Sequence, residues 1–183
     1  MDLLEAYTQT LAFTGTRVAA TRPEQFGDPT PCSDWDVAAL LGHILSVISS
    51  YSALPTGGHA VAPPVEATAD GHHPEAYATL ARDAIKAWSE PGALDRPCHH
   101  VMGVMPGGRA LAIHITDVLL HGWDLAVATG QDTTIDPELA GLATATLRDV
   151  LHLDKGRGRF FAPALPSPGG DPQSVLLAYA GRG

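Results

Sequence analysis

Apolar residues recur every three or four positions along five stretches of the chain, a spacing typical of amphipathic helices. The expected helices cover residues 2–20, 33–53, 74–90, 109–130 and a segment that opens at Pro137. There is no internal repeat and no break in composition, which predicts one domain over residues 1–183. The pattern therefore predicts an all-α fold, an antiparallel four-helix bundle with a short, partly extended C-terminal tail.

Capping residues refine the ends of these helices. Ser33 is the expected N-cap of the second helix, and Asp36 completes a capping box with Asp in place of the usual Glu. Pro74 opens the third helix and Gly130 caps the fourth. Between the helices, we expect a long loop or flap at residues 54–72 and an irregular connection at 91–108, and after them a partly extended tail from Lys155 with short runs at 160–164 and 175–179.

The segment Arg109–Gly130 is apolar around most of its helical wheel, which indicates a buried helix. One narrow stripe of this helix is ionisable and carries His114, Asp117, His121 and Asp124. Such a stripe is costly in a protein interior unless water or a cation compensates it. We therefore expect it to face a cavity or to hold a metal ion.

The charge pattern narrows the classes of partner. The net charge is −9 and the basic residues are scattered, which argues against nucleic acid and anionic membranes. No uninterrupted apolar run approaches the roughly 20 residues of a bilayer span, and the start of the chain lacks a signal-peptide pattern. Cys32 and Cys98 form no metal-type pair. These features predict reduced thiols and a cytoplasmic protein.

Asp117 and His121 stand four residues apart, so their side chains meet on one face and make half of a divalent-metal site. A third ligand must come from a facing helix, and His43 is the best candidate because it lies mid-helix among small residues. Two imidazoles and one carboxylate leave coordination positions open, as in catalytic sites. The alternative is that His43 is simply a solvent-facing residue of an amphipathic helix.

Other candidates are weaker. His114 lies too far along the helix axis to share the ion with His121, so it lines the cavity, bonds Asp117, or is a satisfied core histidine. Asp124 is expected to pair with a group beside the ligands or with Arg109 or Arg148. The remaining metal-type residues lie in predicted loops and are minor candidates, namely His72, His73, Cys98, His99 and His100.

Two stretches resemble the paired signatures of a known family. Thr30–His43 (TPCSDWDVAALLGH) and Asp117–Gly130 (DVLLHGWDLAVATG) are similar to actinobacterial DinB-like proteins, and more narrowly to the N-terminal domain of mycothiol-dependent maleylpyruvate isomerase. The resemblance implies a DinB-like four-helix bundle that binds a divalent metal through His43, Asp117 and His121. Two departures stand against it: the isomerase has Glu where this chain has Asp117, and it carries a second, C-terminal domain that we do not expect here.

The sequence and the resemblance together predict a metal-dependent enzyme whose ion, zinc by the simplest choice, activates the thiol of mycothiol or a similar low-molecular-weight thiol. The other substrate would be a small electrophile admitted beside residues 54–72, with His114 as a catalytic proton shuttle. Alternatives are a hydrolase or cyclase that uses the same metal, oxygen chemistry at non-haem iron, and a binding module without turnover. The oligomeric state stays open, with a homodimer as one alternative.

Overall fold

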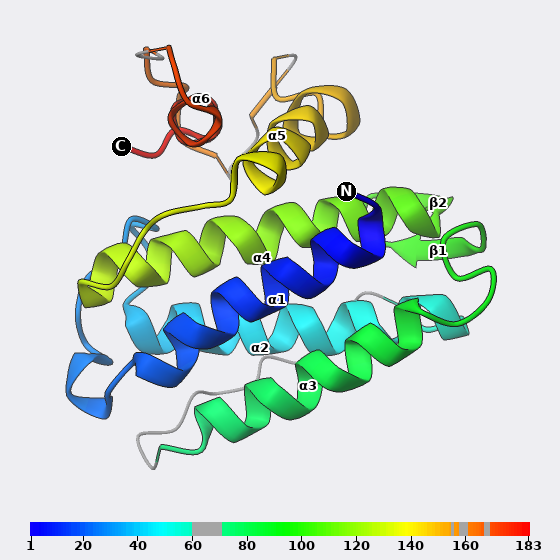
Figure 1. The fold of residues 1–183 in the computed structure, drawn as a ribbon, viewed down its shortest axis with the longest axis horizontal. Helices are drawn as coiled ribbons and strands as arrows, with labels where there is room; N and C mark the ends of the chain where they lie inside the picture. The colour runs from blue at the N-terminus through cyan, green and yellow to red at the C-terminus, as the bar shows by residue number, and fades with distance from the viewer. Residues whose placement is uncertain (60–70, 155, 158–160, 167–168) are drawn as a thin grey trace.

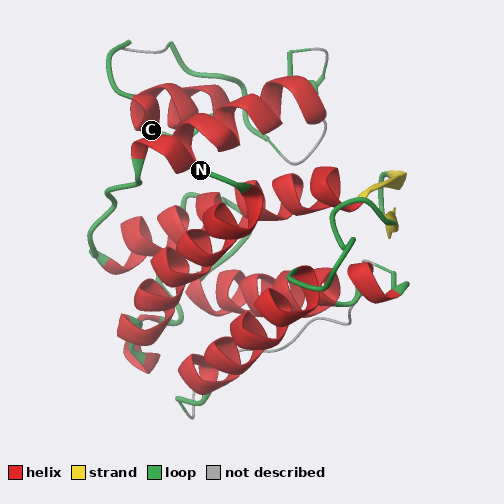
Figure 2. Cartoon of the chain, turned by 45° about the vertical axis from the view of Figure 1, so that its right-hand side comes forward, coloured by secondary structure: helices red, strands yellow, loops and turns green. Residues whose placement is uncertain are grey.

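The computed structural model describes residues 1–59, 71–154, 156–157, 161–166 and 169–183. Helices dominate this part of the chain and a two-stranded hairpin lies at one end (Figure 2). The elements are α1 (Leu3–Ala20), α2 (Val37–Ser52), α3 (His73–Trp88), β1 (Pro97–His100), β2 (Gly103–Pro106), α4 (Gly107–Thr129), α5 (Pro137–Ala145) and α6 (Pro172–Ala180). Most of residues 54–72, the expected loop or flap, lies outside the described residues, as do Lys155 and the start of the run at 160–164.

The four long helices α1–α4 pack side by side around the main core. Figure 1 shows α1 and α4 running in one direction and α2 and α3 in the other. The expected antiparallel order is therefore only partly right, because α2 and α3 are parallel neighbours. Parallel neighbours need a long connection, and residues 53–72 supply one.

The C-terminal part forms a second layer. Helices α5 and α6 pack on each other, and α5 lies against α4, on the side away from α2 and α3 (Figure 1). The expected partly extended tail did not include a helix, but residues 175–179 belong to α6. The overlooked signals are the N-cap Asp171, which accepts a hydrogen bond from the amide of Ser174, and Gly181, which ends the helix in a left-handed conformation.

Two further expectations need correction. Residues 97–106 are a hairpin rather than part of an irregular connection, and Gly103 makes its tight turn possible with φ +110°. The N-cap of α2 is Asp36 instead of Ser33, since the Asp36 carboxylate accepts a hydrogen bond from the amide of Ala39 at 2.8 Å. The helix thus starts three residues later than a Ser33 cap would place it.

Helix α4 is the buried centre of the fold, as its apolar wheel predicts. By length and composition alone, Val37–Thr56 and α4 would both pass for membrane spans, contrary to the expectation from uninterrupted runs. That is weak evidence, because 89% of the apolar window of α4 is buried inside the protein and core helices pass the same test. Gly122 lets α1 come close, since a Cβ there would lie 2.3 Å from Thr14 Oγ1.

Candidate metal centre

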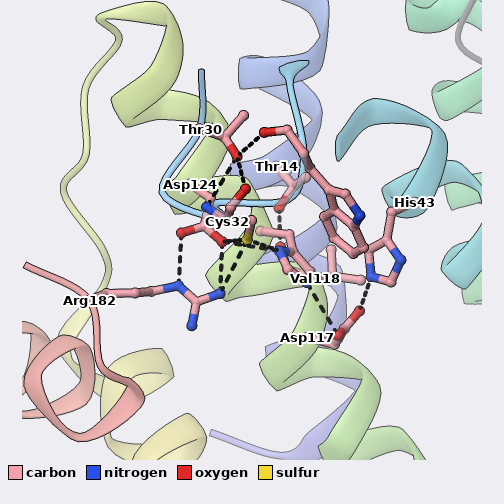
Figure 3. A network of polar contacts seen from close by, with 10 residues as sticks. Thr14, Thr30, Cys32, His43, Asp117, Val118, Asp124 and Arg182 are labelled. Carbon is pink, nitrogen blue, oxygen red and sulfur yellow. Dashed lines mark hydrogen bonds and ion pairs between the residues drawn. The ribbon is translucent and has the colours of Figure 1, made fainter. Parts of the chain in front are cut away.

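The three residues predicted to bind a metal lie together on the facing sides of α2 and α4 (Figure 3). His43 Nε2 lies 3.4 Å from Asp117 Oδ2, and His121 Nε2 lies 3.6 Å from Asp117 Oδ1. Potential ligand atoms of all three residues fall within 4.8 Å of one another. The alternative of a solvent-facing His43 is not supported, because its Nε2 is buried against Asp117.

The spacing of this trio, His43, Asp117 and His121, fits a divalent ion. Ligands about 2.1 Å from a tetrahedral zinc ion lie about 3.4 Å from each other, close to the distances between the nitrogen and oxygen atoms here. His43 Nε2 and Asp117 Oδ2 are buried and face each other at 3.4 Å, but neither makes a hydrogen bond among the described residues. Buried polar atoms without hydrogen bonds are costly, so a cation between the two would satisfy both.

The charge of Asp117 also suits a cation. Burial alone would raise the pKa of this carboxyl, but the neighbouring His121 and His43 hold the pKa below its usual value. Asp117 is therefore a carboxylate at neutral pH. The side chains of His43 and Asp117 are 28% and 33% exposed, so one side of the trio is open to solvent.

The second ring nitrogen of His121 is fixed by a buried carboxylate. His121 Nδ1 lies 3.0 Å from Asp124 Oδ2, and Asp124 is 0% exposed. Burial would raise the pKa of Asp124, but hydrogen bonds from His121 and Arg182 lower it to about 2, so Asp124 accepts and Nδ1 carries the proton. The lone pair on Nε2 then faces Asp117, as in the carboxylate–histidine pairs that support metal ligands.

Arg182 neutralises Asp124 from the end of the chain. Its Nε and one terminal nitrogen each lie 2.8 Å from a different Asp124 oxygen, a two-pronged pair (Figure 3). Of the expected partners of Asp124, the two arginines are wrong, because Arg109 donates to the Val150 carbonyl and Arg148 lies 5.9 Å from the Tyr179 ring, whereas the alternative of a group beside the ligands is right. Sequence spacing could not reveal Arg182, because it is 58 residues away.

Cys32 extends the same network on the far side of His121. Its thiol donates to Asp124 Oδ2 at 3.3 Å and lies 3.7 Å from His121 Nδ1, so Cys32, His121 and Asp124 form a second possible ligand group. The polar atoms of this group are already paired with each other or with Arg182, and an ion there would sit beside a guanidinium. Burial raises the pKa of Cys32, and Asp124 raises it further, to about 12, so the sulfur is a neutral thiol.

Comparison with known proteins places this arrangement in a family. The profile of the mycothiol maleylpyruvate isomerase N-terminal domain matches residues 7–126. The chain belongs to this family. Two uncharacterized proteins of Mycobacterium tuberculosis, from strains H37Rv and CDC 1551 / Oshkosh, are each 34% identical over 187 aligned residues, covering 100% of this chain and 98% of theirs.

Solved structures of the family share the fold. A crystal structure of mycothiol-dependent maleylpyruvate isomerase superposes with a TM-score of 0.75 and 16% identity, over 100% of this chain and 90% of that one. A crystal structure of a histidine-to-alanine mutant of such an isomerase gives 0.60 and 14%, over 80% of this chain and 68% of that one. The first superposition includes α5 and α6, so the likeness extends beyond the residues matched by the family profile.

His114 lies one turn before Asp117 on α4 but is oriented into the core. It is 0% exposed, its Nε2 lies 2.9 Å from the Tyr7 hydroxyl, and its ring stacks on Tyr51 at 4.3 Å. Burial lowers the pKa of His114 to about 3, which keeps the ring neutral. These contacts favour the core-histidine alternative, and no hydrogen bond joins His114 to Asp117 among the described residues. Its role as a proton shuttle stays a prediction.

Among the described residues, none of the minor candidates shares a possible ligand group with the trio. Cys98 is a buried free thiol whose pKa is raised by burial, and His73 bonds the Thr21 carbonyl. His99 is exposed and its ring lies 4.9 Å from His59. His100 is buried and pairs with the Tyr51 hydroxyl.

Trp35 is a site residue that sequence patterns missed. Its ring lies 4.6 Å from the His43 ring and 5.6 Å from the His121 ring. The Trp35 ring therefore covers one side of the trio and shields two of its members from water. It comes from the turn before α2, where an isolated aromatic gives no periodic signal.

Proposed function

We propose that this protein is a metal-dependent enzyme that joins a low-molecular-weight thiol such as mycothiol to a small electrophile, or isomerises the electrophile through such a thiol. The observation that carries the proposal is the convergence of His43, Asp117 and His121 at ligand spacing with one side open. The family to which the chain belongs, named for a mycothiol-dependent isomerase, supports the choice of thiol. Zinc is the simplest ion for two imidazoles and a carboxylate.

Each residue of the site has a definable part in this proposal. A divalent ion held by the trio would bind the thiol sulfur as thiolate and so supply a nucleophile at neutral pH. Asp124 holds the His121 proton on Nδ1, so that Nε2 is free to bind the ion. Arg182 keeps Asp124 ionised, and Trp35 excludes water from one side.

The proposal also carries the remaining predictions. The fold is a DinB-like four-helix bundle with a C-terminal layer, the protein acts in the cytoplasm, and neither nucleic acid nor membrane is a partner, consistent with a net charge of −9. Cys32 is not the nucleophile, because its pKa of about 12 leaves it protonated. The other cysteine, Cys98, is buried and its pKa is also raised, so the proposal takes the reacting thiol from outside the chain.

Two measurements test the proposal together. Purified protein should contain close to one divalent metal ion per chain by elemental analysis, and His43→Ala should lose it, while His99→Ala, at an exposed histidine outside the site, should keep it. The parent should then conjugate mycothiol to an electrophile in a metal-dependent reaction. Protein that holds metal but shows no reaction with any thiol would contradict the thiol part, and parent and His43→Ala proteins that both lack metal after purification and reconstitution would contradict the metal part.

A further inference from the structure

Tyr51 lies near the trio, but among the described residues it makes no hydrogen bond, ion pair or ring contact with His43, Asp117 or His121. It occupies the last turn of α2, two turns after His43, and long helical side chains lean back over the preceding turn. Its ring stacks at 4.3 Å and 11° on His114, which is one turn before Asp117. This stacking, together with the electrostatic effect of the Asp117 carboxylate on the Tyr51 hydroxyl, places Tyr51 near the metal centre. The Tyr51 side chain is only partly buried, unlike the ring of His114.

His100 determines which way the Tyr51 hydroxyl proton points. The amide of Met102 donates a hydrogen bond to His100 Nδ1 at 3.0 Å, so this nitrogen carries a lone pair. Burial lowers the pKa of His100, so the ring is neutral, and we assign its single proton to Nε2. Nε2 faces the Tyr51 hydroxyl and therefore donates to its oxygen.

None of the described residues accepts the Tyr51 hydroxyl proton. A hydroxyl that accepts from His100 must direct its own proton elsewhere, and no other hydrogen bond of Tyr51 is found among the described residues. Burial raises the pKa of Tyr51, and the Asp117 carboxylate raises it further, so the hydroxyl keeps this proton. The site thus holds an oriented, neutral hydrogen-bond donor for which the described part of the chain provides no acceptor.

We propose that Tyr51 is a catalytic residue whose hydroxyl donates a hydrogen bond to the substrate oxygen that gains negative charge when the thiol attacks, and that His100 is its positioning residue. The proposal rests on the thiol-dependent function proposed above. In the addition to an α,β-unsaturated ketone, the sulfur forms a bond to the β-carbon and the π electron pair moves through the α-carbon to the carbonyl oxygen. The enolate then takes a proton from water at the α-carbon, replacing the proton that the thiol released.

A pair of electrophiles separates this role from a structural one. Benzylideneacetone develops charge on its carbonyl oxygen when a thiolate adds to it, whereas benzyl chloride expels chloride and develops no charge on oxygen. With mycothiol as the thiol, Tyr51→Phe should lower kcat/KM for benzylideneacetone by about 100-fold, the typical effect of removing one such donor. It should leave the benzyl chloride reaction and the metal content unchanged.

Control variants complete the experiment. Tyr77→Phe removes another buried tyrosine hydroxyl, which donates to the Leu11 carbonyl in the core, and should leave the reactivity with both electrophiles unchanged. For His100, Gln keeps an N–H near the position of Nε2 and should retain most of the benzylideneacetone rate, while Leu should lose it.

The outcomes are distinguishable. Equal losses with both electrophiles, or no loss with either in a variant that folds and binds metal, would overturn the assignment of Tyr51 while leaving the thiol-dependent function intact. A parent protein that reacts with neither electrophile in the presence of mycothiol would remove both proposals at once. A Leu variant of His100 as active as the Gln variant would overturn the positioning role.

Discussion

Replacing Arg182 by Met removes the cation that neutralises the most buried carboxylate of the site. Asp124 is 0% exposed, and Arg182 contributes two contacts of 2.8 Å to it. Met keeps the apolar stem of the arginine, so the change mainly removes charge. The carboxylate that remains is buried with only His121 and the Cys32 thiol as partners.

Removing one partner of a buried ion pair typically costs about 3–5 kcal/mol, because the other charge stays uncompensated. The remaining His121 contact places the expected loss for Arg182→Met at the lower end, about 3 kcal/mol. For a chain of 183 residues this corresponds to a fall in Tm of about 6–12 °C. Asp124→Asn leaves Arg182 unpaired at 11% side-chain exposure and should cost about 2 kcal/mol.

The assay is denaturant unfolding of the parent, the two single variants and the double variant at pH 7. Because the two side chains interact directly, the double variant should be more stable than the sum of the single losses predicts, by at least about 1 kcal/mol. Additive losses within about 0.5 kcal/mol would refute the reasoning, since independent sites behave in that way. A parent-like Arg182→Met variant would refute it more simply.

Three further predictions follow from single contacts. Asp124→Asn should weaken metal binding by about 10- to 100-fold in competition with a chelator, because the Nδ1 partner of a ligand is lost, and unchanged affinity would contradict this role. Gly122→Ala should destabilise the protein by about 2 kcal/mol in thermal melts, since its Cβ would lie 2.3 Å from Thr14 Oγ1, whereas Gly141→Ala, with nothing within 4 Å, should not. The pKa of His114 falls from 6.5 to about 3 on folding, so the unfolded chain binds the proton first and stability should fall as pH drops below 6.5, by about 3 kcal/mol at about pH 4. His114→Gln should flatten this dependence in unfolding experiments across that pH range, and equal slopes would contradict the assignment.

Local signals predicted most of the helices but not their order in space. The 3.6-residue period identified α1–α5, because helix formation depends on residues three and four apart, although the cap expected for α2 was misplaced. The parallel pair α2 and α3 depends on which faces meet, which no single helix encodes. Helix α6 was missed because its nine residues are too short for a clear period, although Asp171 and Gly181 mark its ends.

The candidate site divides in the same way. The sequence allowed the prediction of the trio His43, Asp117 and His121. Two of them share a helical face, and the third interrupts a face of small residues. The residues that bond to Asp124 beside this trio could not be predicted from the sequence. Cys32 comes from a turn and Arg182 from the last residues of the chain. Such contacts depend on tertiary packing, and the sequence holds no spacing rule that relates positions 58 residues apart.

The long-range pair with Arg182 makes the C-terminal layer part of the site. Helices α5 and α6 pack on each other, and α6 has few contacts with the four long helices, so the Arg182–Asp124 pair, just beyond the end of α6, is one of the contacts that join this region to α4. An ion bound by the trio would make His121 Nδ1–H a stronger hydrogen-bond donor to Asp124. The stronger bond would in turn favour the ionised Asp124 carboxylate with which Arg182 pairs. Binding and docking are then linked, and linkage is reciprocal: docking of α6 favours metal binding by the same free energy by which metal binding favours docking. The contact of His121 with Asp124 and the two contacts of Asp124 with Arg182 therefore connect the proposed metal centre on α2 and α4 to the folding of the C-terminal layer, which supplies no metal ligand.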